Sequence, residues 1–154
     1  MSADALTLVR QRALGLLARR EHSRAELTQK LSGVGTPAEV DAVLTHLSAL
    51  DLQSDARMAE SYVRAKAARL GSARLRYELK QRGISDELIA AALSCGIDET
   101  EDEYSRARAV WRGKFKAPPQ DAREWSKHAR FLAGRGFSPE IIRKILKEPF
   151  DDAT

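Results

Sequence analysis

The sequence predicts an all-α protein, and three observations lead to this prediction. Apolar residues recur at spacings of three and four, as they do on one face of a helix, and they do not alternate as in a strand. Ala, Leu, Arg and Glu dominate, and these residues lose little side-chain freedom in a helix. Signals for helix starts and stops divide the chain into short segments.

The start signals are capping residues. Ser23 and Thr36 are each followed three residues later by Glu, which is the pattern of a capping box. Further starts are expected at Ser85, Asp121 and Ser138, where acids or Pro follow. The stop signals are glycines expected to adopt positive φ, at Gly71, Gly83, Gly96 and Gly136, and prolines, at Pro118, Pro119 and Pro149.

Between these signals we expect nine helices, over residues 5–20, 24–32, 37–50, 55–70, 73–82, 86–94, 99–116, 122–135 and 139–147. Four of them carry a clear apolar face. These faces are Leu6, Val9, Ala13, Leu16 and Leu17; Val40, Val43, Leu44 and Leu47; Met58, Ala59, Tyr62 and Val63; and Tyr104, Ala107, Val110 and Trp111.

The helices fall into three similar groups. Residues 79–89 match residues 132–142 at an offset of 53, including Gly83 against Gly136. A single group of three helices buries too little apolar surface to fold stably alone, whereas stacked groups can bury their apolar faces against one another. We therefore expect three tandem three-helix repeats, over 1–52, 53–97 and 98–148, stacked into an elongated, curved rod and followed by an acidic tail at 149–154.

The charge of the 154-residue chain is zoned, although its net value is only +4. Residues 57–82 carry eight basic and two acidic side chains, residues 86–103 carry seven acids and no base, and residues 106–147 carry twelve basic and three acidic side chains. Basic blocks of this kind attract polyanions, although a solvated ionic surface is the simpler interpretation.

The composition also indicates the cellular compartment of the protein. We find no apolar stretch of the ~20 residues that a membrane span needs, and no secretory signal. A single cysteine, Cys95, suits a reducing compartment. We expect a cytoplasmic monomer that binds no cofactor and no metal.

The search for catalytic motifs is negative. His22, His46 and His128 lack the spacing of a zinc site and are expected at the surface or at helix ends. Cys95 lacks an activating base and is expected to be structural. The acidic run 99–103 fits a linker and helix start better than a metal site, because consecutive acids on a helix point in different directions. We expect no enzyme.

A binding surface remains. The Gly-closed helix pairs are similar to helix-turn-helix modules, but helices 37–50 and 86–94 would present acids such as Glu39, Asp41, Asp86 and Glu87, which repel phosphate. Only helix 139–147 is suitably basic. The candidate partner- and DNA-binding residues are Arg64, Arg69, Arg74, Arg76, Lys80, Arg82, Arg108, Arg112, Lys114, Arg130, Arg135, Arg143 and Lys144. Tyr77, Trp111 and Trp125 could stack on bases, but their spacing favours core packing.

Several segments together resemble the regulatory protein RecX family. They are residues 20–31, 55–64, 71–85 and 131–138, with Ile141 and Ile142, and the resemblance spans about residues 10–147. Met58 departs from the family pattern, which usually has an aromatic residue there, and Met fills such a gap adequately.

The resemblance implies tandem three-helix repeats. It also implies a partner, the filament that RecA forms on single-stranded DNA, in whose groove such proteins lie and restrain recombination, DNA repair and the SOS response. A free-standing helix-turn-helix-like DNA-binding regulator is the alternative, and a protein-only adaptor is a third. The filament interpretation predicts weak, sequence-indifferent binding to naked DNA.

Overall fold

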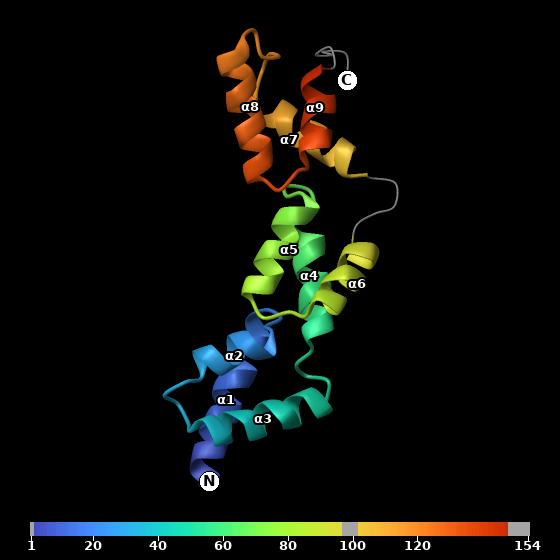
Figure 1. The fold of residues 1–154 in the computed structure, drawn as a ribbon. Helices are drawn as coiled ribbons and strands as arrows, with labels where there is room; N and C mark the ends of the chain where they lie inside the picture. The colour runs from blue at the N-terminus through green and yellow to red at the C-terminus, as the bar shows by residue number, and fades with distance from the viewer. Residues whose placement is uncertain (1, 97–101, 148–154) are drawn as a thin grey trace. The chain divides into compact units, whose positions relative to one another are not determined.

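Every regular element of the described residues, 2–96 and 102–147, is a helix in the computed structural model (Figure 1). The helices are α1 (Ala3–Arg19), α2 (Arg24–Lys30), α3 (Pro37–Ala49), α4 (Asp55–Lys66), α5 (Ser72–Gln81), α6 (Asp86–Gly96), α7 (Glu103–Lys114), α8 (Ala122–Gly134) and α9 (Pro139–Lys147). Within the same ranges, pairing of extended backbone is limited to an isolated bridge between Ser32 and Gly35. The all-α prediction is confirmed.

The predicted helix starts are largely correct because the capping residues do form caps. The Ser23 and Thr36 side chains accept hydrogen bonds from the amides of Glu26 and Glu39, and both glutamates reach back to the cap. The Asp121 side chain caps α8 by accepting from the Glu124 amide, while the Glu124 carboxylate accepts from the Gln120 amide. Each cap satisfies amides that the first turn of a helix leaves without a partner.

Two predicted helices are too long. The helix expected over 55–70 ends at Lys66, and the Arg106 guanidinium from α7 donates to the carbonyls of Ala67 and Leu70 just beyond that end. The helix expected over 99–116 begins at Glu103, because Asp102 accepts from the Ser105 amide and caps it. The acidic residues 99–101 and the predicted tail at 149–154 lie outside the described residues.

The chain divides into two compact units, which we describe separately. One unit comprises Met1–Tyr62 and Leu79–Ala92, and the other comprises Val63–Glu78 and Leu93–Thr154. The division passes through α4, α5 and α6, so the predicted second repeat contributes to both units. The predicted repeat boundaries and the predicted rod stay predictions.

The first unit buries one predicted apolar face completely, that of Val40, Val43, Leu44 and Leu47, whereas the predicted face of α7 in the second unit buries Ala107 and Trp111 and leaves Tyr104 and Val110 partly buried. In the first unit α3 packs on α1 and α2, and the core consists of Val9, Ala13, Leu27, Leu31, Val40, Val43, Leu44 and Leu47. In the second unit α7, α8 and α9 pack on one another around Ala107, Trp111, Leu132, Phe137, Ile142, Ile145 and Leu146. The expectation that Trp111 is a core residue is therefore correct, since it is 1% exposed.

The turns at Gly83 and Gly136 are equivalent, as the offset of 53 residues predicts. Both glycines have positive φ, of 80° and 90°, and the residue after each donates to the carbonyl of Leu79 or Leu132. Gly71 does not have positive φ, which corrects the prediction, and Gly96 is the last residue of α6 rather than a residue beyond it. A different constraint acts at Gly71, where an added Cβ would lie 2.3 Å from the Gly136 carbonyl oxygen.

Each unit also contains the same contact between consecutive repeats, which we call the joint. In the first unit the Arg24 amide at the start of α2 donates to the Asp55 carboxylate (2.8 Å), and the Ser23 hydroxyl donates to the Arg82 carbonyl. In the second unit the Ser72 amide, 48 residues further on, donates to the Glu103 carboxylate (3.1 Å). There the Gly71 amide donates to the Arg135 carbonyl (2.7 Å), 53 residues after Arg82. An acid at the start of one repeat thus caps the second helix of the repeat before it.

Candidate functional site

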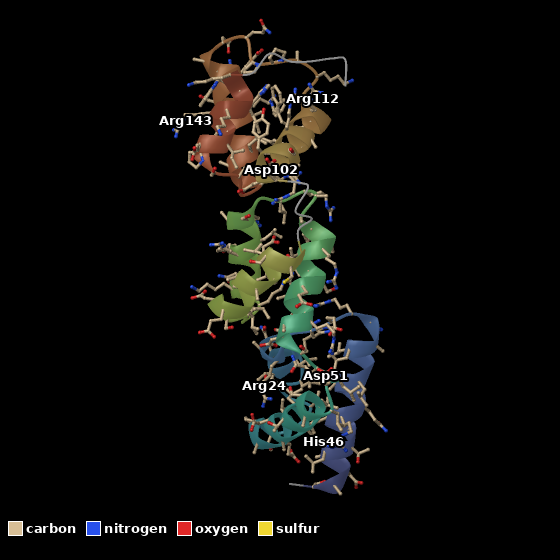
Figure 2. All side chains as sticks on the ribbon, turned by 90° about the vertical axis from the view of Figure 1, so that its right-hand side faces the viewer. Arg24, His46, Asp51, Asp102, Arg112 and Arg143 are labelled. Carbon is tan, nitrogen blue, oxygen red and sulfur yellow. The ribbon has the colours of Figure 1, made fainter. Side chains whose placement is uncertain are left out.

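The thirteen cationic residues predicted to bind a partner differ in whether they already form ion pairs within the protein. Six are exposed and form neither an ion pair nor an aromatic-ring contact with any of the described residues; these are Arg64, Arg69, Arg76, Arg130, Arg143 and Lys144. Arg143 projects from α9, as its label in Figure 2 indicates. These six are best placed to meet an anionic partner, because such a contact would break no internal ion pair.

Others of the set are paired within the protein. Arg74 lies 3.2 Å from Glu78, and Lys80 lies 3.5 Å from Asp86. Arg82 pairs with Glu26 at 3.1 Å and lies 4.9 Å from the centre of the Tyr62 ring. Arg108 and Arg112 are half-buried in α7, where Figure 2 labels Arg112.

Arg82 has a structural role at the first joint, which charge counting missed. Its carbonyl accepts from Ser23 and its guanidinium pairs with Glu26. Burial acts to raise the pKa of the Glu26 carboxyl, but hydrogen bonds from Arg20 and Ser23 and the charge of Arg82 outweigh burial and lower this pKa. The glutamate is therefore ionised at neutral pH and holds both arginines.

A groove of about 380 Å³ in the second unit brings three predicted cations together. This third-repeat groove is lined by Ala68, Arg69, Ala109, Val110, Gly113, Lys114, Phe131 and Arg135. Lys114 Nζ lies 5.8 Å and the Arg135 guanidinium 5.1 Å from the centre of the Phe131 ring. The lining combines three cations with an apolar floor and includes no acid.

Sequence reasoning missed a second groove, of about 510 Å³, in the first unit. This first-repeat groove is lined by Gln11, Arg12, Gly15, Leu16, Arg19, Lys30, Leu31 and Val34. It also has three cations and no acid in its lining, although residues 1–56 carry one more acid than base. The available signal was the spacing of Arg12, Gly15 and Arg19, which places them on one face of α1.

The third helix of each repeat is poorly suited to read DNA in the first two repeats. In α3, Asp41 is exposed and pairs with Arg24, which Figure 2 labels, whereas Glu39 is buried in its capping box and does not face outward as expected. In α6, Asp86 and Glu87 are exposed. Exposed cations occur on α9, namely Arg143, Lys144 and Lys147, as the sequence predicts.

Two predicted core aromatics are instead exposed. Tyr77 is 56% exposed and Trp125 is 39% exposed. Their helical spacing was compatible with a core, but the buried faces of α5 and α8 are formed by Leu75 and Leu79 and by His128 and Leu132. Both rings therefore keep a face available for stacking.

The histidines also differ from expectation, because two of the three are buried. His128 accepts a hydrogen bond at Nδ1 from Trp111 Nε1 (2.9 Å) and stacks on Phe115 with ring centres 3.7 Å apart. His22 lies with Nδ1 3.0 Å from the Arg20 carbonyl and Nε2 3.1 Å from Lys30 Nζ. Burial lowers the pKa of both imidazoles. They are neutral packing residues at pH 7, while His46 is exposed in the last turn of α3.

The described residues contain no group of three or more His, Cys, Asp or Glu side chains that could hold a metal ion. Among the helices that the structure describes, none is both long enough and apolar enough to cross a membrane. Cys95 is exposed in α6, which does not fit the structural role expected for it.

The comparisons with known proteins agree with this architecture. Three family models match the chain: the first three-helix domain of RecX over residues 10–47, the second over 54–93 and the third over 101–146. The regulatory protein RecX of Leptothrix cholodnii is 47% identical over 137 residues, which covers 88% of this chain and 85% of that protein. That of Chromobacterium violaceum is 39% identical over 153 residues, covering 99% and 97%.

Two solved structures have a similar fold. The crystal structure of RecX from Lactobacillus salivarius matches 95% of this chain and 97% of its own, with a TM-score of 0.75 and 24% identity. A crystal structure of regulatory protein RecX matches 95% and 75%, with a TM-score of 0.77 and 25% identity. Fold and similarity together define an all-helical protein of tandem three-helix domains. The chain belongs to the RecX regulatory protein family.

Proposed function

We propose that this protein is a non-enzymatic regulator that binds the RecA–single-stranded-DNA filament in its groove and inhibits or modulates recombination and DNA repair. The observation that carries the proposal is family membership over all three domains, combined with exposed cations that lie on many helices instead of on one reading helix. A partner made of protein and DNA presents acidic side chains and phosphates in several directions, which fits this distribution. We further propose that the protein acts as a cytoplasmic monomer.

The acidic surfaces of α3 and α6 argue against sequence-specific reading of duplex DNA. Phosphate would meet Asp41 in the first repeat and Asp86 and Glu87 in the second. The alternative, a free-standing DNA-binding regulator, is supported by the cations of α9 alone. It predicts tight binding to a preferred duplex sequence.

The proposal is tested by charge reversal at Arg64, Arg69 and Arg76, which are exposed and form no ion pair with the described residues. Arg74 and Lys80 are less suitable, since both are ion-paired and the Arg74 backbone packs against Gly136. The triple change to Glu should weaken inhibition of RecA strand exchange by about tenfold or more, because each reversal replaces attraction by repulsion. Reversal of Lys116, Arg123 and Lys127, exposed cations outside the candidate set and outside α9, serves as the matched control.

Three outcomes separate the candidates. Binding that strengthens when RecA coats the DNA supports the filament proposal. Tight binding to naked duplex with a sequence preference would support the DNA-binding alternative, and binding to RecA that ignores DNA altogether would support a protein-only adaptor.

A further inference from the structure

The first-repeat groove and the third-repeat groove are formed by equivalent residues. The buried residues Val9 and Ala13 of α1 correspond to Ala107 and Trp111 of α7, an offset of 98. Leu31 at the end of α2 corresponds to Leu132 of α8, an offset of 101. With these offsets, six of the eight lining residues of each groove fall on the same positions. The matching positions are 11 and 109, 12 and 110, 15 and 113, 16 and 114, 30 and 131, and 34 and 135.

The lining of each groove includes a helical glycine, Gly15 in the interior of α1 and Gly113 one residue before the end of α7. Glycine in a helix interior is unfavourable relative to alanine because the unfolded chain loses more freedom. An added Cβ would meet no atom of the protein within 4 Å at either position. Packing within the described chain therefore does not require glycine at either position, and the missing side chain leaves room for a ligand to approach the helix.

The rim of each groove is cationic, although different positions supply the charge. Arg12, Arg19 and Lys30 line the first-repeat groove. Arg69, Lys114 and Arg135 line the third-repeat groove. Neither lining contains an acid, so both grooves favour an anionic occupant.

The floors favour a protein segment over a nucleic acid. Leu16, Leu31 and Val34 beside Gly15 offer an aliphatic surface, and the first-repeat lining contains no ring on which a base could stack. In the third-repeat groove the one ring, Phe131, already has Lys114 and Arg135 against it. Both grooves therefore combine apolar lining residues with cationic ones.

We propose that both grooves bind the same kind of segment, an acidic stretch of protein whose apolar side chain rests on the glycine. Two equivalent sites on one chain fit a partner that presents the same segment on successive subunits. This last step rests on the proposed function, in which that partner is the RecA filament. If each groove binds its segment weakly, the two together would bind the partner more tightly, because once one groove is occupied the second binding event is intramolecular.

The substitutions Gly15→Leu and Gly113→Leu test the proposal, because leucine fills the floor and is a good helix former. Gly134→Leu is the matched control, since Gly134 is also helical, also open around its Cβ and not part of either lining. The probe is a short fluorescent peptide of glutamates and leucines, titrated against the full chain. The unmodified protein should bind two peptides, each single variant one and the double variant none, while Gly134→Leu should still bind two.

Probe variants identify the chemistry. Replacing the leucines of the peptide by serine, or its glutamates by glutamine, should each weaken binding about tenfold. Two peptides bound to the double variant, or a single site in the unmodified protein, would refute the proposal. Oligo(dT) that binds as tightly as the peptide and is lost in the same variants would assign the grooves to nucleic acid instead.

The final arm uses the RecA filament on single-stranded DNA. The double glycine variant should bind it about tenfold more weakly than the Gly134→Leu control. Unchanged filament binding by a variant that no longer binds peptide would overturn this inference and leave the proposed function intact. Failure of the unmodified protein to bind the filament would overturn the proposed function, while the peptide stoichiometry still decides whether the grooves are equivalent sites.

Discussion

The glycines of this chain have different structural roles, which depend on the atoms that surround each one. At Gly71 the backbone of the following repeat comes so close that a methyl group would overlap the Gly136 carbonyl. At Gly134 the surroundings are open. Sequence alone assigned Gly71 to a positive-φ cap, because a glycine after a helix is most often that.

Replacing Gly71 with Ala should therefore destabilise the second unit by about 2–4 kcal/mol, because the obstructing atoms are backbone and cannot rotate away. Urea unfolding measures this loss. Gly134→Ala is the control and should leave stability unchanged or raise it by up to about 1 kcal/mol. Equal stability of the two variants would contradict the close approach.

His128 should make the second unit sensitive to acid. Its Nδ1 accepts a hydrogen bond from Trp111 Nε1–H, so this nitrogen carries no proton in the folded protein. Burial lowers the pKa of the imidazole below 6.5. The unfolded chain therefore binds more protons in the window below pH 6.5, so stability is complete above that pH and is lost as pH falls through the folded-state pKa. The charge of nearby Glu124 acts to raise the His128 pKa, against the effect of burial, and the charge of Lys127 acts to lower it further.

The measurement is the free energy of unfolding between pH 7.5 and pH 5, followed by Trp fluorescence. His128→Phe should flatten the slope in part, since His22 has a lowered pKa for the same reason. An unchanged slope in His128→Phe would assign the acid sensitivity elsewhere.

The candidate cations illustrate why sequence predicts a site only in part. Charge zoning identified Arg69, Lys114 and Arg135, which do meet in one groove. It could not reveal that Arg82 pairs with Glu26, because 56 residues separate them and the pairing arises from tertiary contact. Nor could it reveal that Arg106 is buried and donates to the carbonyls of Ala67 and Leu70, since an arginine on a helix gives the same local pattern when exposed.

At the scale of elements, caps were predictable because they are encoded within four residues. The boxes at Ser23 and Thr36 and the cap at Asp121 formed where the sequence places them. Helix ends were less predictable when a distant residue sets them. Just beyond the end of α4, the Arg106 guanidinium donates to the carbonyls of Ala67 and Leu70, a contact that no local signal near Lys66 reveals.

Ser23 and Thr36 provide a comparison between two caps. Both side chains cap a helix, but the Ser23 hydroxyl also donates to the Arg82 carbonyl and is fully buried. We expect Ser23→Ala to lower the free energy of unfolding by about 2–3 kcal/mol, and Thr36→Ala by about 1 kcal/mol. Chemical denaturation of both variants measures the difference, and equal losses would mean that the hydroxyl contributes nothing to the joint.

At the scale of the whole molecule, the charge distribution governs association. Exposed cations lie on several helices of the second unit, while Asp41, Asp86 and Glu87 of the first unit face solvent. Such a surface binds polyanions by counterion release but does not read bases.

We therefore expect naked single- and double-stranded DNA to bind weakly, without sequence preference, and at least tenfold more weakly at ~200 mM than at ~50 mM salt. Fluorescence anisotropy across a salt series measures this. Binding that is insensitive to salt, or that prefers one sequence strongly, would contradict the expectation.

The joints have a consequence for how such a protein changes over time. On the second helix of each pair the amide that docks belongs to the main chain, at Arg24 and at Ser72, and the carbonyls that accept at Arg82 and Arg135 are main-chain groups too. Substitution at Arg24, Ser72, Arg82 or Arg135 leaves these groups in place, proline at 24 or 72 apart, so that each joint depends on few side chains: the Asp55 carboxylate and Ser23 hydroxyl in one and the Glu103 carboxylate in the other. Neighbouring modules can thus drift apart in sequence, as Ser23 and Gly71 already have, and still dock by the same rule.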